Sequence, residues 1–233
     1  MDNKLIPEDG TYDGILAKRI DQLFEYNEVI GFVGVGADNL EAISNRIESK
    51  ASINHPEFLV RRCSVKALLA SEGSEPLRVK MQQTILKMYD EIIQRQGKSV
   101  NPPSGDLPSD FRDDLEDRSD LINNRIILIV SEYEECLMLS DRERKDFIGQ
   151  LLFMLCDEGA MNFKLCPVLM SMFPLKWPEY DALPGPSTVF SRVYAATSEV
   201  KKYSRRELEE FLAKLDAKNR DGIQRYLSAS GVL

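Results

Sequence analysis

Short runs of hydrophobic residues alternate along the chain with longer segments in which hydrophobic residues recur every three or four positions. The short runs predict strands at 28–33, 58–65, 125–130, 164–173 and 188–196. The helical spacing predicts helices at 11–26, 39–50, 77–96, 140–159 and from 204 onward. Strands that alternate with helices form β-α-β units. We therefore expect an α/β fold with a mostly parallel sheet flanked by helices on both faces.

Several helix ends are marked by their residue types. Asp38 or Asn39 can cap the helix at 39–50. Capping boxes start two other helices, Ser140 with Glu143 and Ser204 with Glu207, and Gly159 is expected to end the first of them. Within that helix, residues 147–155 are apolar nearly all round, so they must be covered on more than one side. Burial in the chain's own core and docking to a partner both remain open.

The segment 98–120 interrupts the pattern, because it is rich first in proline and then in acidic residues. Its composition predicts a flexible surface loop within a core formed by residues 1–203. An acidic docking segment that becomes ordered on a partner is the alternative. We expect residues 204–233 to form a separate helical segment after the core.

Charge and hydropathy exclude some classes of protein. The formal net charge of −8 argues against a protein that coats nucleic acid through its overall field. The longest apolar runs, such as 126–130 and 151–155, are too short to span a membrane. The first residues lack the basic and apolar regions of a signal peptide. We therefore expect an intracellular protein, cytoplasmic or nuclear, with no membrane partner.

The residues that commonly bind metals are few and scattered. Cys63, Cys136, Cys156 and Cys166 are widely spaced and form no Cys-x-x-Cys pair, so we expect reduced and mostly buried thiols. The single histidine, His55, lies in a turn-like Asn-His-Pro sequence and is not expected to be catalytic. We expect no metal site.

The stretch 28-EVIGFVGVGADNLEAISNRI-47 reads as a strand, a glycine turn and an amphipathic helix. This is the layout of a phosphate-binding loop. However, the stretch contains no lysine followed by serine or threonine, which such a loop uses to bind phosphate and Mg²⁺.

The order of these pieces resembles the core of P-loop NTPases. A later apolar strand with acidic residues after it, 125-RIILIVSEYEE-135, and a further apolar strand at 164–173 follow the glycine loop, as in that family. The closing part, 188–215, is similar to the exit from the core into the lid in the AAA+ and STAND branches. The resemblance covers roughly residues 11–215 and implies that 204–233 is a short helical remnant of a lid.

Two alignments of the glycine loop to this family are possible. In the first, Gly31, Gly34 and Gly36 match the family's glycines, which puts Ala37 at the lysine and Asp38 at the Ser/Thr. An alanine supplies no positive charge, and an aspartate repels a triphosphate.

The second alignment takes Gly34 as the first glycine and Asn39 in place of the last. It puts Leu40 at the lysine and Glu41 at the Ser/Thr. We favour it because it gives the strand its full length and starts the helix on a good cap. The chemistry of phosphate binding fails here in the same way.

The second nucleotide motif is also altered. The resemblance puts Ser131 at the magnesium-associated aspartate and Glu132 at the catalytic glutamate, on a strand expected to lie beside that of the glycine loop. Ser171 falls near the family's polar sensor, although a serine at a strand end is common. Arg192 and the cluster 201-KKYSRR-206 are candidates for contact with phosphate or nucleic acid, but a solvated start of the last helix is the favoured interpretation.

The resemblance thus implies a catalytically inactive, ATPase-like domain, a pseudo-ATPase, with no bound cofactor. It implies an interaction or regulatory subunit of a larger complex. A complex that acts on DNA is one candidate. The expected partner is a protein, of which an active ATPase subunit is one candidate, and nucleic acid is contacted only indirectly. A non-hydrolysing nucleotide- or dinucleotide-binding protein is the main alternative, and an enzyme of another α/β class is the third.

Overall fold

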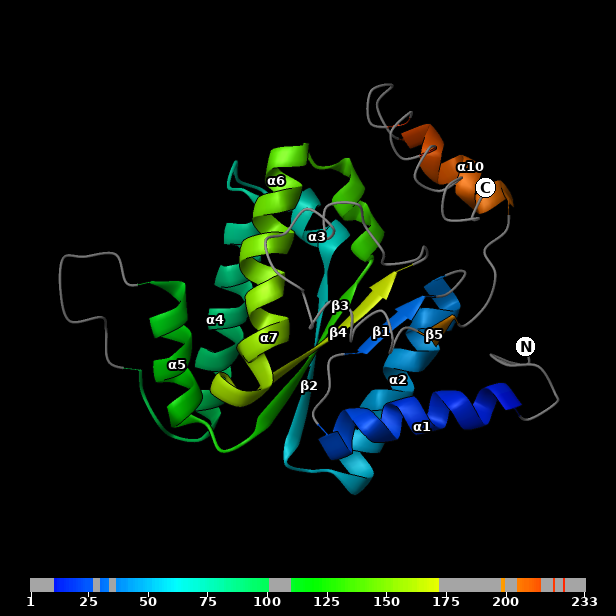
Figure 1. Ribbon diagram of the computed structural model, residues 1–233. Helices are drawn as coiled ribbons and strands as arrows, with labels where there is room; N and C mark the ends of the chain where they lie inside the picture. The colour runs from blue at the N-terminus through cyan, green and yellow to red at the C-terminus, as the bar shows by residue number, and fades with distance from the viewer. Residues whose placement is uncertain are drawn as a thin grey trace.

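The computed structural model describes residues 11–26, 30–33, 37–100, 110–171, 198–199 and 205–214, together with Arg220 and Gln224. Its centre is a parallel sheet of five strands in the order β2-β3-β4-β1-β5 (Figure 1). The strands are β1 (Ile30–Val33), β2 (Phe58–Ser64), β3 (Arg125–Ser131), β4 (Leu165–Ser171) and β5 (Ser198–Glu199). The predicted strands at 28–33, 58–65, 125–130 and 164–173 are therefore confirmed in the described part, except that Val65 already begins a helix and Lys164 precedes β4.

Helices connect these strands. The α-helices are α1 (Thr11–Tyr26), α2 (Ala37–Asn54), α3 (Val65–Ala70), α4 (Leu77–Arg95), α5 (Phe111–Leu121), α6 (Asp141–Asp146), α7 (Phe153–Asn162) and α10 (Arg205–Lys214). A 3-10 helix, η1 (Tyr133–Met138), follows β3, and a π-helical segment, η2 (Phe147–Leu152), joins α6 to α7. Among the described residues, no helix is long and apolar enough to cross a membrane.

Helices cover both faces of the sheet, as predicted (Figure 1). Alternate residues of β3 separate into two hydrophobic cores because successive side chains of a strand point to opposite faces. Leu128 packs with residues of α4, α5 and α7, whereas Ile129 packs with residues of α1 and α2. All seven residues of β4 are buried. This explains the continuous apolar runs of β3 and β4.

The predicted neighbour of β1 was wrong. We expected the strand at 125–130 to lie beside the glycine-loop strand, but β4 lies between them and pairs with both β1 and β3. β1, β3 and β4 are all apolar, so hydrophobicity does not distinguish which of them are adjacent.

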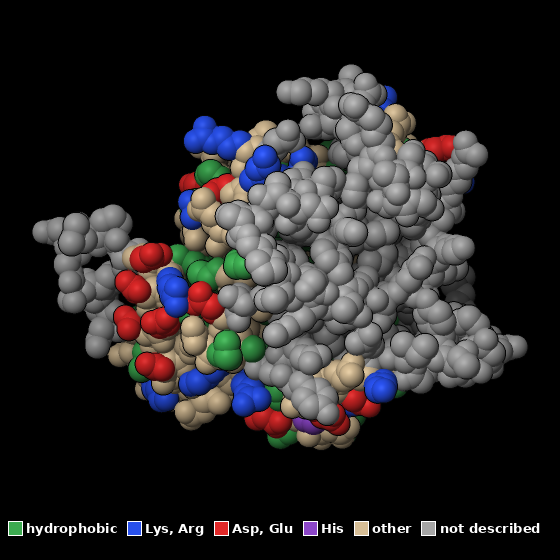
Figure 2. Space-filling view, in the orientation of Figure 1, with side chains coloured by type: hydrophobic (Ala, Val, Ile, Leu, Met, Phe, Trp, Pro, Cys, Tyr) green, Lys and Arg blue, Asp and Glu red, His purple; other side chains and the backbone are tan. Residues whose placement is uncertain are grey.

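The prediction of a flexible loop over 98–120 was wrong for its second half, whereas residues 101–109 lie outside the described part. Asp110 caps α5 by accepting a hydrogen bond from the backbone N–H of Arg112. Leu115 is completely buried, and Arg118 pairs with Asp90 of α4 at 2.8 Å. Acidic side chains gather on the outer surface of α5 (Figure 2). The acidic composition thus belongs to the solvated face of a packed helix.

The predicted helix at 140–159 is confirmed, with its capping box of Ser140 and Glu143, but it does not end at Gly159. It continues through the π-helical segment to Asn162. A Cβ at Gly159 would lie 2.5 Å from the backbone oxygen of Leu165, so glycine allows α7 to approach β4. Residues 147, 148, 151, 152 and 155 are buried. The all-round apolar part of this helix therefore belongs to the chain's own core, which removes it as a docking surface.

The last predicted helix is confirmed over α10, whose Leu212 joins the core that contains α4 and α7. The predicted strand at 188–196 and Ser204 of the second capping box lie outside the described residues, as does Arg192. The division into a core and a lid remnant stays a prediction.

Candidate functional site

The carboxyl ends of the parallel strands meet at one edge of the sheet, where open α/β folds bind ligands. The strand register aligns Ser64 of β2 with Ser131 of β3, and Val33 of β1 with both Ser171 of β4 and Glu199 of β5. The altered motifs predicted from the sequence therefore lie along one edge, although β1 and β3 are not neighbours.

The bounds of β1 and α2 decide where the glycine loop can lie. β1 continues to Val33 and α2 begins at Ala37, so only residues 34–36, which include Gly34 and Gly36, lie between them. Gly31 is a strand residue opposite Leu169 of β4. The strand end fits the favoured alignment, whereas the helix start fits the other one. Neither alignment fits completely.

The predicted capping position was wrong, because Asp38 and Asn39 lie within the first turn of α2, followed by Leu40. The helix starts directly after the glycine segment. The first backbone N–H groups of a helix have no partner within the helix, and those of α2 belong to the turn that begins at Ala37.

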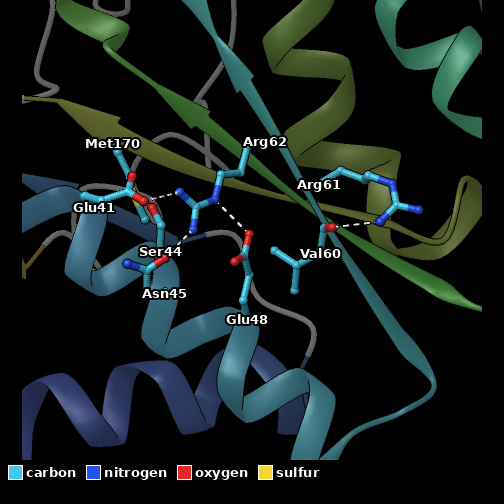
Figure 3. Close-up of polar contacts among 8 residues, drawn as sticks. All are labelled: Glu41, Ser44, Asn45, Glu48, Val60, Arg61, Arg62 and Met170. Atoms are coloured by element: carbon cyan, nitrogen blue, oxygen red, sulfur yellow. Dashed lines mark hydrogen bonds and ion pairs between the residues drawn. The ribbon is translucent and has the colours of Figure 1, made fainter.

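Glu41, the next predicted site residue, is bound by an arginine from β2. The Arg62 guanidinium donates hydrogen bonds to Glu41 Oε1 at 2.6 Å, Glu48 Oε1 at 2.7 Å and Asn45 Oδ1 at 2.7 Å (Figure 3). The three acceptors lie on one face of α2, four and three residues apart. Arg62 therefore fastens α2 to an edge strand.

Hydrogen bonding to Glu48, and then to Glu41, raises the pKa of Arg62 above its ordinary value, although partial burial lowers it. Arg62 is thus a fixed cation beside two carboxylates. Arg62 was not among the site residues predicted from the sequence. The available signal was an arginine pair, Arg61 and Arg62, inside an otherwise apolar strand, with acceptors at helical spacing on α2.

The second altered motif is also held by the β2–α3 junction. Glu132 has a left-handed backbone conformation, φ 55°, directly after β3. Its carboxylate accepts a hydrogen bond from the Ser64 hydroxyl and lies 3.7 Å from Lys66 Nζ. The Ser64 oxygen also accepts a hydrogen bond from the backbone N–H of Ala67, which caps α3. Glu132 is therefore part of a hydrogen-bonded corner between β2, β3 and α3.

The other candidate residues have structural surroundings. Ser171 is fully buried at the end of β4, and Ser131 is half-buried at the end of β3. His55 stacks on Phe24 of α1 with ring centroids 4.5 Å apart. Arg206, the last residue of the basic cluster, pairs with Glu210 on its own helix.

The four cysteines are buried thiols that form no disulfide, as predicted. Burial raises the pKa of Cys63 to about 11 and that of Cys136 well above its ordinary value. Within the described residues, no group of three or more His, Cys, Asp or Glu side chains is placed to hold a metal ion.

No family model matches the chain, and no curated protein matches it either. Solved structures do resemble it. The Walker-type ATPase PABY2304 of Pyrococcus abyssi is 14% identical with a TM-score of 0.46, over 91% of this chain and 61% of that one. The ORC2 protein of Aeropyrum pernix, in ADPNP-ADP complexes, is 14% identical with a TM-score of 0.48, over 94% and 55%. The ORC1 protein of Aeropyrum pernix in complex with DNA is 13% identical with a TM-score of 0.44, over 90% and 51%.

This chain therefore corresponds to between about half and three fifths of those structures. Its assignment to the α/β class rests on its own parallel sheet and the helices on both faces.

Proposed function

We propose that this chain is a P-loop NTPase-like domain that has lost ATP hydrolysis and serves as a protein-interaction or regulatory subunit. The proposal rests on the ion pair between Glu41 and Arg62. In one alignment Glu41 stands where a hydroxyl would hold Mg²⁺, and its carboxylate is bound by Arg62. In the other alignment that position is Asp38, in the first turn of α2.

An acid at this position opposes a nucleotide for an electrostatic reason. The N-terminus of a helix attracts phosphate through its N–H groups and its dipole. A carboxylate in the first turns offsets that attraction, and residues 28–47 contain no lysine to restore it. A triphosphate would therefore meet a carboxylate that is already paired with Arg62, and not the lysine that its β- and γ-phosphates require.

The second motif supports the same proposal. Ser131 supplies no carboxylate for Mg²⁺, and Glu132, which could orient a water molecule, already accepts a hydrogen bond from Ser64. A P-loop-like fold that lacks the charged residues of its nucleotide site can still serve as a binding surface for another protein. The proposed partner is a protein, with an active ATPase subunit of a DNA-processing complex as one candidate.

The direct test is a thermal titration with ATP, ADP and a dinucleotide, each with and without Mg²⁺. A ligand at about 100 times its dissociation constant stabilises the folded state by about 2.7 kcal/mol, which would raise the melting midpoint by roughly 5 °C or more. We expect no shift with any of the three ligands at millimolar concentration. A clear shift at sub-millimolar ATP or ADP would overturn the proposal, and a shift with the dinucleotide alone would favour the Rossmann-like alternative.

A further inference from the structure

The last residues of β2 and the first of α3 supply partners to both altered motifs. Within this short 62–66 segment, Arg62 binds Glu41 of α2, and Ser64 and Lys66 contact Glu132 after β3. The segment runs from the end of the edge strand β2 into α3. It contacts α2 through Arg62 and the residue after β3 through Ser64 and Lys66. One stretch of backbone thus joins the two parts that would otherwise meet at a bound nucleotide.

The contact of this segment with α2 has the larger number of hydrogen bonds. A guanidinium can donate five N–H groups in a rigid plane, and here three of its contacts are 2.7 Å or shorter. Glu41, Asn45 and Glu48 span two turns of the helix, so the contact fixes both its position and its rotation. α2 also reaches the sheet through the Ser44 hydroxyl, which donates to Met170 Sδ at 3.3 Å (Figure 3).

The contact with Glu132 fixes the other element. The left-handed region is unfavourable for a non-glycine residue, so the surrounding contacts must hold Glu132 there. The Ser64 hydroxyl does this while its oxygen caps α3. Lys66 adds a positive charge at 3.7 Å.

We propose that the 62–66 segment is a built-in counter-ion bridge, which holds α2 and the β3–η1 corner in one arrangement without a nucleotide. The inference rests on the proposed function in one respect: no bound nucleotide is needed to hold α2 and the β3–η1 corner together. A domain held in this way keeps one conformation whether or not nucleotide is present, as suits a constant docking surface.

The chain contains a matched control for each half of the bridge. Arg61 precedes Arg62 on the same strand and carries the same charge, but its guanidinium turns away and donates to the carbonyl of Val60 at 2.9 Å (Figure 3). Ser71 lies at the other end of α3, where its hydroxyl donates to Leu68 of that helix at 2.7 Å. Neither control residue has a described contact with α2 or with Glu132.

The test is hydrogen–deuterium exchange on the full chain, followed peptide by peptide. Arg62→Met should raise exchange over residues 41–54 of α2 by about tenfold, and Arg61→Met by less than about twofold, because exchange reports local opening. Ser64→Ala should raise exchange over η1 by about tenfold, and Ser71→Ala by less than about twofold. Residues 77–95 of α4 should keep the exchange of the unmodified protein in all four variants, which shows that the fold is intact.

The bridge is overturned if Arg62→Met affects α2 no more than Arg61→Met, or if Ser64→Ala affects η1 no more than Ser71→Ala. Should Arg62→Met fail to fold, the double variant Glu41→Gln/Glu48→Gln takes its place under the same criterion, because both side chains are exposed and glutamine has nearly the same shape as glutamate. A parallel sample with ATP and Mg²⁺ separates the two proposals. If ATP slowed exchange in α2 of the unmodified protein, the proposed function would fail, while the comparison of Arg62 with Arg61 would still decide the bridge.

Discussion

Gly159 illustrates how a single position can depend on the absence of a side chain. It lies within α7, where alanine is normally the better helix former by about 1 kcal/mol. Here a Cβ would meet the backbone oxygen of Leu165 at 2.5 Å, and a backbone atom of a central strand cannot move aside cheaply. We expect Gly159→Ala to lower the free energy of unfolding by roughly 1–3 kcal/mol, measured by urea denaturation.

The matched control for this substitution is Met161→Ala, two residues further along the same helix. Met161 is 80% exposed, so its truncation should change stability by less than about 0.5 kcal/mol. If Gly159→Ala were as stable as the unmodified protein or more so, α7 would not be packed tightly on β4.

Cys63 provides a prediction about pH. Burial raises the pKa of its thiol from the ordinary value of 9.0 to about 11. The unfolded state therefore loses this proton first as the pH rises. The contribution of Cys63 to stability is fully present well below pH 9 and is lost as the pH rises towards 11, by roughly 2–3 kcal/mol in total.

Comparison with Cys63→Ala isolates this contribution from the other groups that titrate at high pH. The unmodified protein should be the more stable of the two at pH 7.5, and the difference in the free energy of unfolding should shrink steadily between pH 8.5 and pH 10.5. A difference that stays constant over this range would show that the thiol does not titrate as its burial implies.

Among the secondary-structure elements, α5 shows how composition can conceal a helix. Its eleven residues include five acids, which favoured a loop, but three features were available in the sequence. Asp110 is a good cap, acids in the first turn suit the helix dipole, and Phe111, Leu115 and Ile122 recur at helical spacing. The packing of these few apolar residues against α4 could not be predicted from the sequence.

Leu115 tests that docking. Its side chain is completely buried, so Leu115→Ala should lower the free energy of unfolding by about 2–4 kcal/mol. Asp117→Ala, on the exposed face of the same helix, should change it by less than about 0.5 kcal/mol. Equal and small effects in urea denaturation would mean that α5 is not part of the folded core.

The other elements differ in how far they could be predicted, for a physical reason. β3 and β4 were found because strands buried on both faces need continuous apolar runs. Which strands pair was not found, because apolar strands of similar length fit beside one another in several orders. Ser131 and Ser171 lie at the carboxyl ends of β3 and β4, whereas the partners of Glu41 and Glu132 come from β2. Those contacts depend on the tertiary fold.

Across the whole molecule, the sheet connects the two hydrophobic cores with the edge that carries the candidate site. β2, β3 and β4 each contribute side chains to both cores. Packing in the two cores therefore sets the positions of their carboxyl ends.

The fold also allows the two alignments of the glycine loop to be distinguished by restoring the missing residues. Ala37→Lys/Asp38→Ser places a lysine at the first residue of α2, where a phosphate-binding loop carries it, and removes the acid beside it. Leu40→Lys/Glu41→Ser makes the same change in charge one turn further into the helix. We expect the first variant, and not the second, to bind ADP, with a melting midpoint raised by roughly 3–6 °C at ten times the dissociation constant. The second variant controls for general attraction between added positive charge and phosphate. Binding by the second variant alone would favour the alignment that starts at Gly34, and binding by neither would show that residues 34–36 cannot form a phosphate cradle.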